Sequence, residues 1–214
     1  VQTCALPIWG GLVGEDGVTH HGVFDMAAFG AVPGLTIAAP MNEPELRNMM
    51  YTALGSGHPF MIRYPRGHGK GLPWRGEKFE TLPVGRGRRL REGADVALLT
   101  VGTVGNAAAR AAGRAAAEGV SVAHYDLRFV KPLDEALLDE VGRKFRRVVT
   151  VEDGSLRGGV GEAVAAFFNG RGYDVRVQRL GIGDEWVEHG TPGQLYALCG
   201  YDAEGIYHAL KSFR

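Results

Sequence analysis

The densest group of chemically capable side chains lies in a glycine-rich stretch near the start of the chain. Residues 14–25 hold two histidines, three carboxylates and three glycines. Histidine is the most common general acid or base near neutral pH, and glycine lets a backbone approach a ligand closely. The stretch therefore predicts a ligand-facing loop that moves protons, with a solvated surface turn as the alternative. A metal site is disfavoured because no third ligand follows at a standard spacing.

A second group of chemically capable side chains lies at the end of the apolar run 60–65. Arg63 and Arg66 bracket Tyr64 and Pro65 at the carboxyl end of a predicted buried strand. In open α/β sheets ligands bind beyond the carboxyl ends of the strands, and a guanidinium can bind phosphate or carboxylate through two parallel hydrogen bonds. This spacing predicts an anion contact. The alternative is a pair of arginines that bind carbonyl groups or surface carboxylates.

Two further patterns favour structural interpretations. The glycines at 158–161 precede a predicted helix, where backbone N–H groups can hold phosphate. The dinucleotide fingerprint needs Gly or Ala where Val164 stands, so we favour close packing of the helix on its strand. The arginine-rich runs 86–91 and 143–147 contain no aromatic residue except Phe145, and we expect them on a solvated surface.

The composition excludes several classes of protein. The chain has 214 residues with 24 basic and 24 acidic side chains, so it lacks the basic excess of nucleic-acid binders. Hydrophobic residues make up 45%, which is typical of globular proteins and unlike disordered ones. Cys4 and Cys199 are too few for a disulfide framework and fit a reducing compartment. No apolar run reaches the roughly 18 residues of a membrane helix.

Alternating strands and helices are predicted to position these residues. Strand 35–40, helix 42–55 and strand 60–65 form a β-α-β unit, with Asn42 as helix cap, Glu45 closing a capping box and an apolar stripe at Leu46, Met49, Met50 and Ala53. We then expect strands at 95–102, 120–127, 147–151 and 174–180, and helices at 103–118 (capped by Thr103), 134–145, 159–169, and after Thr191 and Asp202. This order predicts an α/β fold with a mostly parallel sheet.

The chain divides at a segment rich in Gly, Pro and charge. We expect one unit at 9–67, a linker at 68–83 and a second unit at 84–214 that can fold alone. Residues 1–8 have neither the basic start nor the apolar core of a signal peptide. We expect them to be a non-native scar, and an ordinary N-terminal strand is the alternative.

Taken in order, these motifs resemble the transketolase-like thiamine diphosphate enzymes. The segments that carry the resemblance, from about Gly10 to the C-terminus, are 14–17, 19–25, 39–43, 62–67, 128–134, 149–153 and 190–191. The His-x-Gly-x-Phe-Asp form of residues 20–25 favours the synthases that join pyruvate to glyceraldehyde 3-phosphate with release of CO₂, over transketolase itself.

The resemblance implies a fold, a reaction and a cofactor. Residues 9–67 correspond to the C-terminal half of a pyrimidine-binding α/β domain, and 84–214 to a complete transketolase C-terminal-type domain. The reaction yields a precursor of isoprenoids and thiamine and uses thiamine diphosphate with Mg²⁺. The family's metal-binding Gly-Asp-Gly…Asn segment and activating glutamate lie upstream of Gly10, so we expect no metal ligand here and no activity of this segment alone.

The resemblance also assigns roles to residues. It implies His20 as the catalytic acid or base, Asp16 as an orienting or substrate-binding group, and Arg66 as the ligand of the acceptor's phosphate. A second phosphate-binding arginine of the family falls at Trp9. His21, Arg63 and Tyr64 are weaker candidates that are expected mainly to hold the loop.

Two alternatives remain open. The chain could be the β subunit of a 2-oxo acid dehydrogenase, although the motifs at 19–22 and 63–67 disfavour this. It could also be a non-catalytic dimerisation or binding module. The resemblance implies a homodimer with pyruvate and glyceraldehyde 3-phosphate as substrates, in the cytoplasm, with no nucleic acid or membrane as partner.

Overall fold

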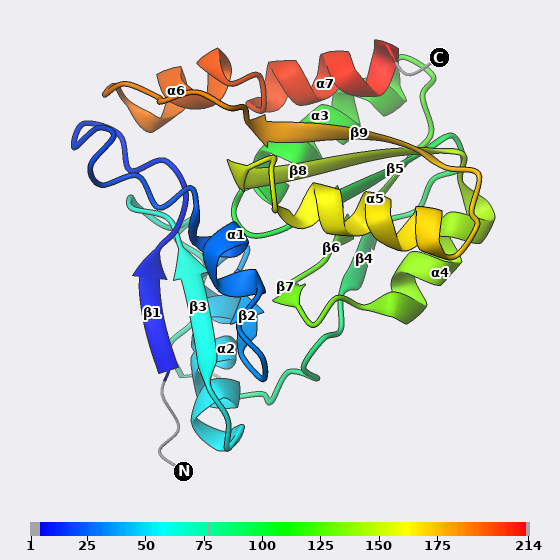
Figure 1. Cartoon of the computed structure of the whole chain (residues 1–214). Coiled ribbons are helices and arrows are strands. Elements are labelled where there is room, and N and C mark those ends of the chain that lie inside the picture. The colour runs from blue at the N-terminus through cyan, green and yellow to red at the C-terminus, as the bar shows by residue number, and fades with distance from the viewer. Residues whose placement is uncertain (1–4, 77, 213–214) are drawn as a thin grey trace.

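Two sheets with helices against their faces make up the chain in the computed structural model, which describes residues 5–76 and 78–212 (Figure 1). The smaller sheet is built mainly from the N-terminal third of the sequence, and the larger sheet from the rest. The α/β class with mostly parallel strands is confirmed.

The smaller sheet has the strand order β1-β3-β2-β7. β1 (Ala5–Trp9), β2 (Thr36–Ala38) and β3 (Phe60–Tyr64) run parallel, as the β-α-β pattern predicts. The short helix α1 (Asp25–Gly30), which the sequence did not predict, precedes β2. β1 includes residues 5–8 of the expected scar. Its pairing with β3 has the geometry of the N-terminal-strand alternative, while the origin of residues 1–8 stays a prediction and residues 1–4 lie outside the described part.

Helix α2 (Glu43–Gly55) connects β2 to β3 and departs from its predicted form in two details. Asn42 caps it by accepting a hydrogen bond from the Glu45 N–H at 3.0 Å. Glu45 does not close the capping box, because its carboxylate instead binds Arg128 in the other half of the molecule. Met49 and Ala53 are buried as predicted, whereas Met50 is 48% exposed and faces away from the core.

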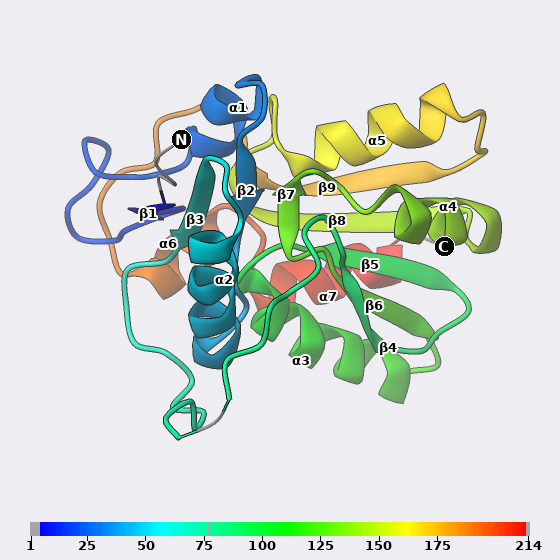
Figure 2. The same ribbon diagram turned by 90° about the horizontal axis from the view of Figure 1, so that it is seen from below.

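The larger sheet has the order β4-β6-β5-β8-β9, and only β4 is antiparallel to its neighbour. Its strands are β4 (Arg88–Arg91), β5 (Val96–Thr100), β6 (Val122–Asp126), β8 (Arg147–Ser155) and β9 (Arg176–Ile182). Its helices are α3 (Val104–Ala117), α4 (Glu135–Lys144), α5 (Val160–Gly170), α6 (Pro192–Leu198) and α7 (Ala203–Ser212). Figure 2 shows α3 and α7 on one face and α4 and α5 on the other. The predicted alternation is confirmed apart from β4, which was missed, and Thr103, whose side chain makes no cap hydrogen bond.

The two halves share their hydrophobic core. Leu12 and Val23 of the N-terminal half are buried in the cluster formed by β5, β6, β8, α3 and α7. Met26 and Ala39 are buried in the cluster on the opposite face of the same sheet. Separating the halves would expose both clusters to water, so burial of apolar surface holds them together.

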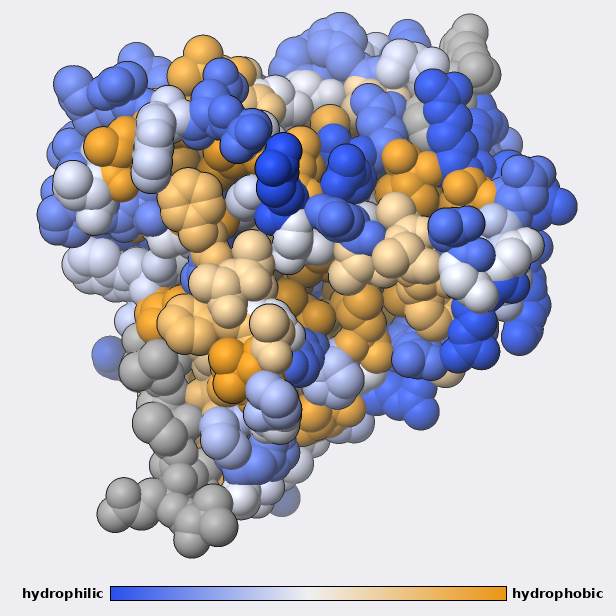
Figure 3. All heavy atoms as spheres, viewed as in Figure 1, coloured by the Kyte–Doolittle hydropathy of each residue, from blue (hydrophilic) through white to orange (hydrophobic). Residues whose placement is uncertain are grey.

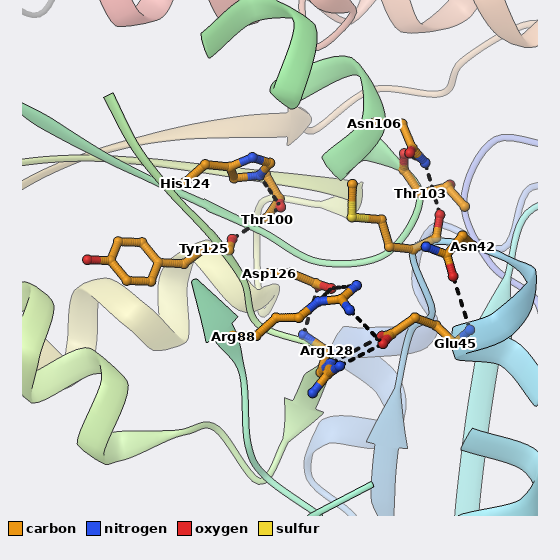
Figure 4. Close-up of polar contacts among 11 residues, drawn as sticks. Asn42, Glu45, Arg88, Thr100, Thr103, Asn106, His124, Tyr125, Asp126 and Arg128 are labelled. Carbon is orange, nitrogen blue, oxygen red and sulfur yellow. Dashed lines mark hydrogen bonds and ion pairs between the residues drawn. The ribbon is translucent and has the colours of Figure 1, made fainter. Parts of the chain in front are cut away.

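One strand of the C-terminal half pairs with the smaller sheet and strengthens the contact between the two halves. β7 (Phe129–Lys131) comes from the C-terminal half but pairs antiparallel with β2 of the smaller sheet. Arg128 just before it has φ of 58°, the left-handed region that L residues rarely adopt. Its guanidinium binds the Glu45 carboxylate at 2.7 Å, and Arg88 approaches the same carboxylate at 2.9 Å (Figure 4). The first arginine-rich run is therefore only partly solvated, because Arg88 also pairs with buried Asp126.

The predicted linker contains no helix or strand among its described residues. It runs along α2, where Phe79 stacks on Tyr51 and the Leu82 N–H donates to Thr52 Oγ1 at 2.8 Å.

On the face seen in Figure 1, apolar residues gather over α1 and α5 (Figure 3).

Candidate active site

The glycine-rich stretch forms a closed loop between β1 and α1. We call residues 11–22 the site loop. An antiparallel bridge joins its ends, with Gly11 N–H to Gly22 O at 2.8 Å and Gly22 N–H to Gly11 O at 2.9 Å. Within the loop, the N–H groups of His20 and His21 both donate to Gly17 O, at 3.0 and 3.2 Å. This turn leaves Asp16 and His20 exposed at the tip.

The structure brings Asp16 and Arg66 together across 50 residues of sequence. Arg66 Nη1 donates to Asp16 Oδ2 and lies 3.5 Å from the carbonyl oxygen of Val13. The two side chains are 35% and 40% exposed, so a solute can reach both. The Arg66 guanidinium also lies 6.0 Å from the centre of the Trp9 ring, the position at which the resemblance implies a second arginine.

His20 lies on the same loop but is not oriented by Asp16. Its Nδ1 is 2.9 Å from Thr19 Oγ1. Thr19 therefore contacts the His20 ring in the orienting role that was one of the two roles expected of Asp16. The imidazole is exposed, which keeps it accessible to a substrate.

His21 points inward and holds the loop together. Its Nδ1 accepts a hydrogen bond from the Val13 N–H at 3.1 Å. The neutral ring must then carry its proton on Nε2. That nitrogen is buried and has no partner among the described residues.

Arg63 is a structural arginine, and only 4% of its side chain is exposed. Its Nε donates to Asp25 Oδ2 at 2.7 Å, and its Nη2 donates to the Asp153 carbonyl oxygen at 2.8 Å. Burial lowers the pKa of Arg63, but the carboxylates of Asp25, Asp153 and Glu152 outweigh it and raise the pKa overall. The guanidinium stays charged, and it joins α1 to β8.

Asp153 is a buried acceptor that the sequence marked only as part of a motif. Its Oδ1 accepts from the Leu12 N–H at 3.0 Å and the Tyr201 hydroxyl at 2.8 Å, and its Oδ2 accepts from the Tyr196 hydroxyl at 3.3 Å. Burial raises the pKa of Asp153 even though Arg63 and these donors lower it. The signal in the sequence was a carboxylate within a buried strand. We call Asp25, Arg63, Asp153, Tyr196 and Tyr201 the buried seam.

Glu152 accounts for the glycines at 158–161. Its carboxylate accepts hydrogen bonds from the N–H groups of Val160 at 2.7 Å and Gly161 at 2.8 Å. A Cβ on Gly159 would overlap the same carboxylate. The N-terminus of α5 is thus already filled, which agrees with the packing interpretation. Burial raises the pKa of Glu152 to about 7 although the two N–H groups lower it.

A cavity of about 810 Å³ opens beside Arg66 and Tyr64, between the end of β3 and helices α3 and α6. Its basic side chains are Arg66, His68, Lys70 and Arg110, and its one carboxylate, Glu43, accepts from the Gly71 N–H at 2.6 Å. His20 and Asp16 are not among its lining residues. Sequence reasoning missed Lys70 and Arg110, because only the fold brings them to the end of β3.

Within the described ranges, no three His, Cys, Asp or Glu side chains converge on a point that could hold a metal ion. None of the helices in that part of the chain is both long enough and apolar enough to span a bilayer.

Comparisons with known proteins agree with the order of the two halves. Residues 3–70 match the family described as the transketolase pyrimidine binding domain, and residues 85–206 match the transketolase C-terminal domain. Over 202 residues the chain is 56% identical to the 1-deoxy-D-xylulose-5-phosphate synthase of Bacteroides fragilis, a match that covers 94% of this chain and 31% of that protein. The synthase of Symbiobacterium thermophilum is 46% identical over 92% of this chain and 30% of its own length.

The chain therefore spans less than a third of the length of these curated relatives. Among solved structures, a split-gene transketolase described as an inactive β4 tetramer matches with a TM-score of 0.84 and 28% identity, over 98% of this chain and 65% of that one.

Proposed function

The chain belongs to the transketolase family, and we propose that it forms part of the pyrimidine-binding domain and the C-terminal domain of a 1-deoxy-D-xylulose-5-phosphate synthase. The proposed reaction joins pyruvate to glyceraldehyde 3-phosphate and yields 1-deoxy-D-xylulose 5-phosphate and CO₂. The observation that carries the proposal is the solvent-accessible contact of Arg66 with Asp16 on the site loop. It is supported by the 46–56% identity to proteins of that name.

The cofactor enters only through the family. When bound, thiamine diphosphate supplies the carbanion chemistry of such reactions. No group of three or more His, Cys, Asp or Glu side chains converges among the described residues, so we assign no Mg²⁺ or diphosphate ligand to them. We derive no step through that group, and we expect the 214-residue chain by itself to be inactive. The inactive assembly of the split-gene neighbour is consistent with this expectation.

Arg66 binds the phosphate of the acceptor in this proposal. An exposed ion pair stabilises a protein by roughly 0–1 kcal/mol, so a phosphate dianion can displace the Asp16 carboxylate at little cost. The planar guanidinium then offers two parallel N–H donors to phosphate oxygens. Once displaced, Asp16 is free to accept a hydrogen bond from a hydroxyl group of the acceptor.

His20 transfers the proton at the acceptor's carbonyl oxygen. When the new carbon–carbon bond forms at the aldehyde carbon, the carbonyl oxygen gains negative charge and takes a proton. An exposed imidazole next to Thr19 can donate that proton and be reprotonated from solvent. His21 and Arg63 support the loop, and Tyr64 lines the adjoining cavity.

A chimaera tests the proposal directly. Residues 10–214 of this chain replace the segment that they match in the Bacteroides fragilis synthase, and the purified protein is supplied with thiamine diphosphate, Mg²⁺, pyruvate and glyceraldehyde 3-phosphate. We expect equal amounts of 1-deoxy-D-xylulose 5-phosphate and CO₂. A folded, dimeric chimaera that makes no such product would overturn the proposal. Acyl transfer to a lipoyl group would instead support the 2-oxo acid dehydrogenase alternative.

A further inference from the structure

The site loop lies against a segment from the far end of the chain. In both ribbon views the blue stretch after β1 runs beside the orange stretch that leads into α6 (Figures 1 and 2). We call residues His189–Pro192 the support turn. Its Gly190 N–H donates to Gly14 O at 3.4 Å. The tip of the site loop therefore rests on the C-terminal domain.

The fit between the two segments requires glycine in the site loop. Gly14 and Gly17 have φ of +86° and +70°, which glycine adopts without strain. A Cβ on Gly14 would lie 3.0 Å from Pro192 Cδ, and one on Gly17 would lie 3.4 Å from His189 Cβ. The backbone of the loop thus packs directly on the side chains of the support turn.

The C-terminal domain also holds both ends of the loop. Asp153 accepts the Leu12 N–H at 3.0 Å just after the loop begins, and the Ser155 N–H donates to Val23 O at 2.8 Å just after it ends. The Leu12 and Val23 side chains are buried in the cluster that contains Val187. β8 and the segment 187–192 of one domain therefore fix a loop that belongs to the other domain.

The support turn is itself fixed on both sides. Val187 is buried shortly before it. At its end, Thr191 caps α6 in a reciprocal box with Gln194, and Leu195 of the same helix is buried. The support turn therefore offers a rigid contact surface to the site loop.

From this geometry we infer that the C-terminal domain positions His20 and Asp16, with Asp153 and Pro192 as positioning residues. This inference rests on the proposed function. A loop with four glycines has many conformations open to it when unsupported, and ordering it costs conformational entropy. A displacement of 1 Å can lower a rate by about a hundredfold. The support of the C-terminal domain restricts the loop to one conformation before substrate binds.

The first test uses the 214-residue chain and needs no catalytic activity. Amide hydrogen exchange is measured in Pro192→Ala and in Leu198→Ala, a control on the same helix whose side chain is 74% exposed. We expect faster exchange at the hydrogen-bonded amides of Leu12, Val13, His20 and His21 in Pro192→Ala, and none of this change in Leu198→Ala. Unchanged exchange of the loop amides in Pro192→Ala would overturn the inference.

The second test measures catalysis in the chimaera. Pro192→Ala is expected to lower kcat about tenfold with the KM for pyruvate and the thermal midpoint unchanged, since only the position of the loop is altered. Leu198→Ala should match the unsubstituted chimaera. A kcat within twofold in Pro192→Ala would contradict the inference. An unsubstituted chimaera without activity would refute the proposed function instead, and the exchange experiment would still decide the inference.

Discussion

The buried seam and the exposed pair of Asp16 and Arg66 use the same chemistry for different purposes. Arg63 and Arg66 stand three residues apart at the end of β3, and each binds an aspartate from the segment between β1 and β2. The Arg63 side chain is 4% exposed and that of Arg66 is 40% exposed. The difference in burial teaches which arginine holds the fold and which one is available to a substrate.

Energetics follow from that difference in exposure. Removing one partner of a buried ion pair leaves an uncompensated charge and costs about 3–5 kcal/mol. An exposed pair contributes roughly 0–1 kcal/mol and is easily exchanged for another partner. Residues of the seam should therefore affect folding when they are substituted, and the exposed residues of the site loop and Arg66 should affect catalysis.

The largest effect is expected at His20. In the chimaera, His20→Ala should lower kcat by about 10²–10⁴, the range for a positioned acid or base, without lowering the thermal midpoint. His208→Ala, which removes an exposed imidazole on α7, serves as the control and should leave kcat unchanged. If kcat fell less than tenfold in His20→Ala, His20 would be a structural residue. The contrast between the buried seam and a catalytic site loop would then fail.

Arg63 should give the largest loss of stability. Arg63→Ala in the 214-residue chain should lower the free energy of unfolding by about 3–5 kcal/mol, because Asp25 and the Asp153 carbonyl lose their buried partner. Urea titration measures the loss, with Arg66→Ala as the matched control that should change the free energy by less than about 1 kcal/mol. Equal losses of stability in the two variants would show that Arg63 contributes no more to folding than Arg66 does.

A smaller effect should appear in the pH dependence of stability. The pKa of folded Glu152 is about 7, above its ordinary value of 4.5, so the folded state binds the proton more tightly than the unfolded state. The resulting stabilisation is fully present below about pH 4.5 and is lost as the pH rises through about 7. A glutamine at this position cannot lose a proton in this way. The free energy of unfolding of Glu152→Gln minus that of the original chain should therefore increase as the pH rises from 5 to 8.

Unfolding at each pH in that range measures this gain. Glu162→Gln is the matched control, because Glu162 lies on α5, the helix whose first N–H groups Glu152 binds, and its side chain is 53% exposed. A difference between Glu152→Gln and the original chain that does not vary with pH would show that the Glu152 carboxylate is not held in a buried, proton-binding environment.

Local signals in the sequence predicted much of the fold. Asn42 caps its helix where expected, since a cap depends on residues only three positions away. β4 and β7 were missed because they lack a hydrophobic alternation of their own. β4 is rich in arginine, and β7 is three residues long and becomes a strand only by pairing with β2 in the other half.

The candidate site was predicted less completely. The residue types of Asp16, His20 and Arg66 identified them as candidates, but their partners depend on the folded chain. Asp16 binds Arg66 rather than orienting His20. Nothing in the local sequence distinguishes a buried Arg63 from an exposed Arg66, and the support of the site loop by residues 189–192 is a contact across most of the chain.

The most direct test of this account compares the two arginines in one assay. In the chimaera, kcat/KM is measured for glyceraldehyde 3-phosphate and for unphosphorylated glyceraldehyde, and their ratio cancels differences in the folded fraction. Arg66→Lys should reduce the ratio about tenfold or more, because the two-bond phosphate contact is lost. Arg63→Lys should leave the ratio unchanged even if it lowers stability. A ratio unaffected by Arg66→Lys, or reduced equally by Arg63→Lys, would contradict the assignment of phosphate binding to Arg66.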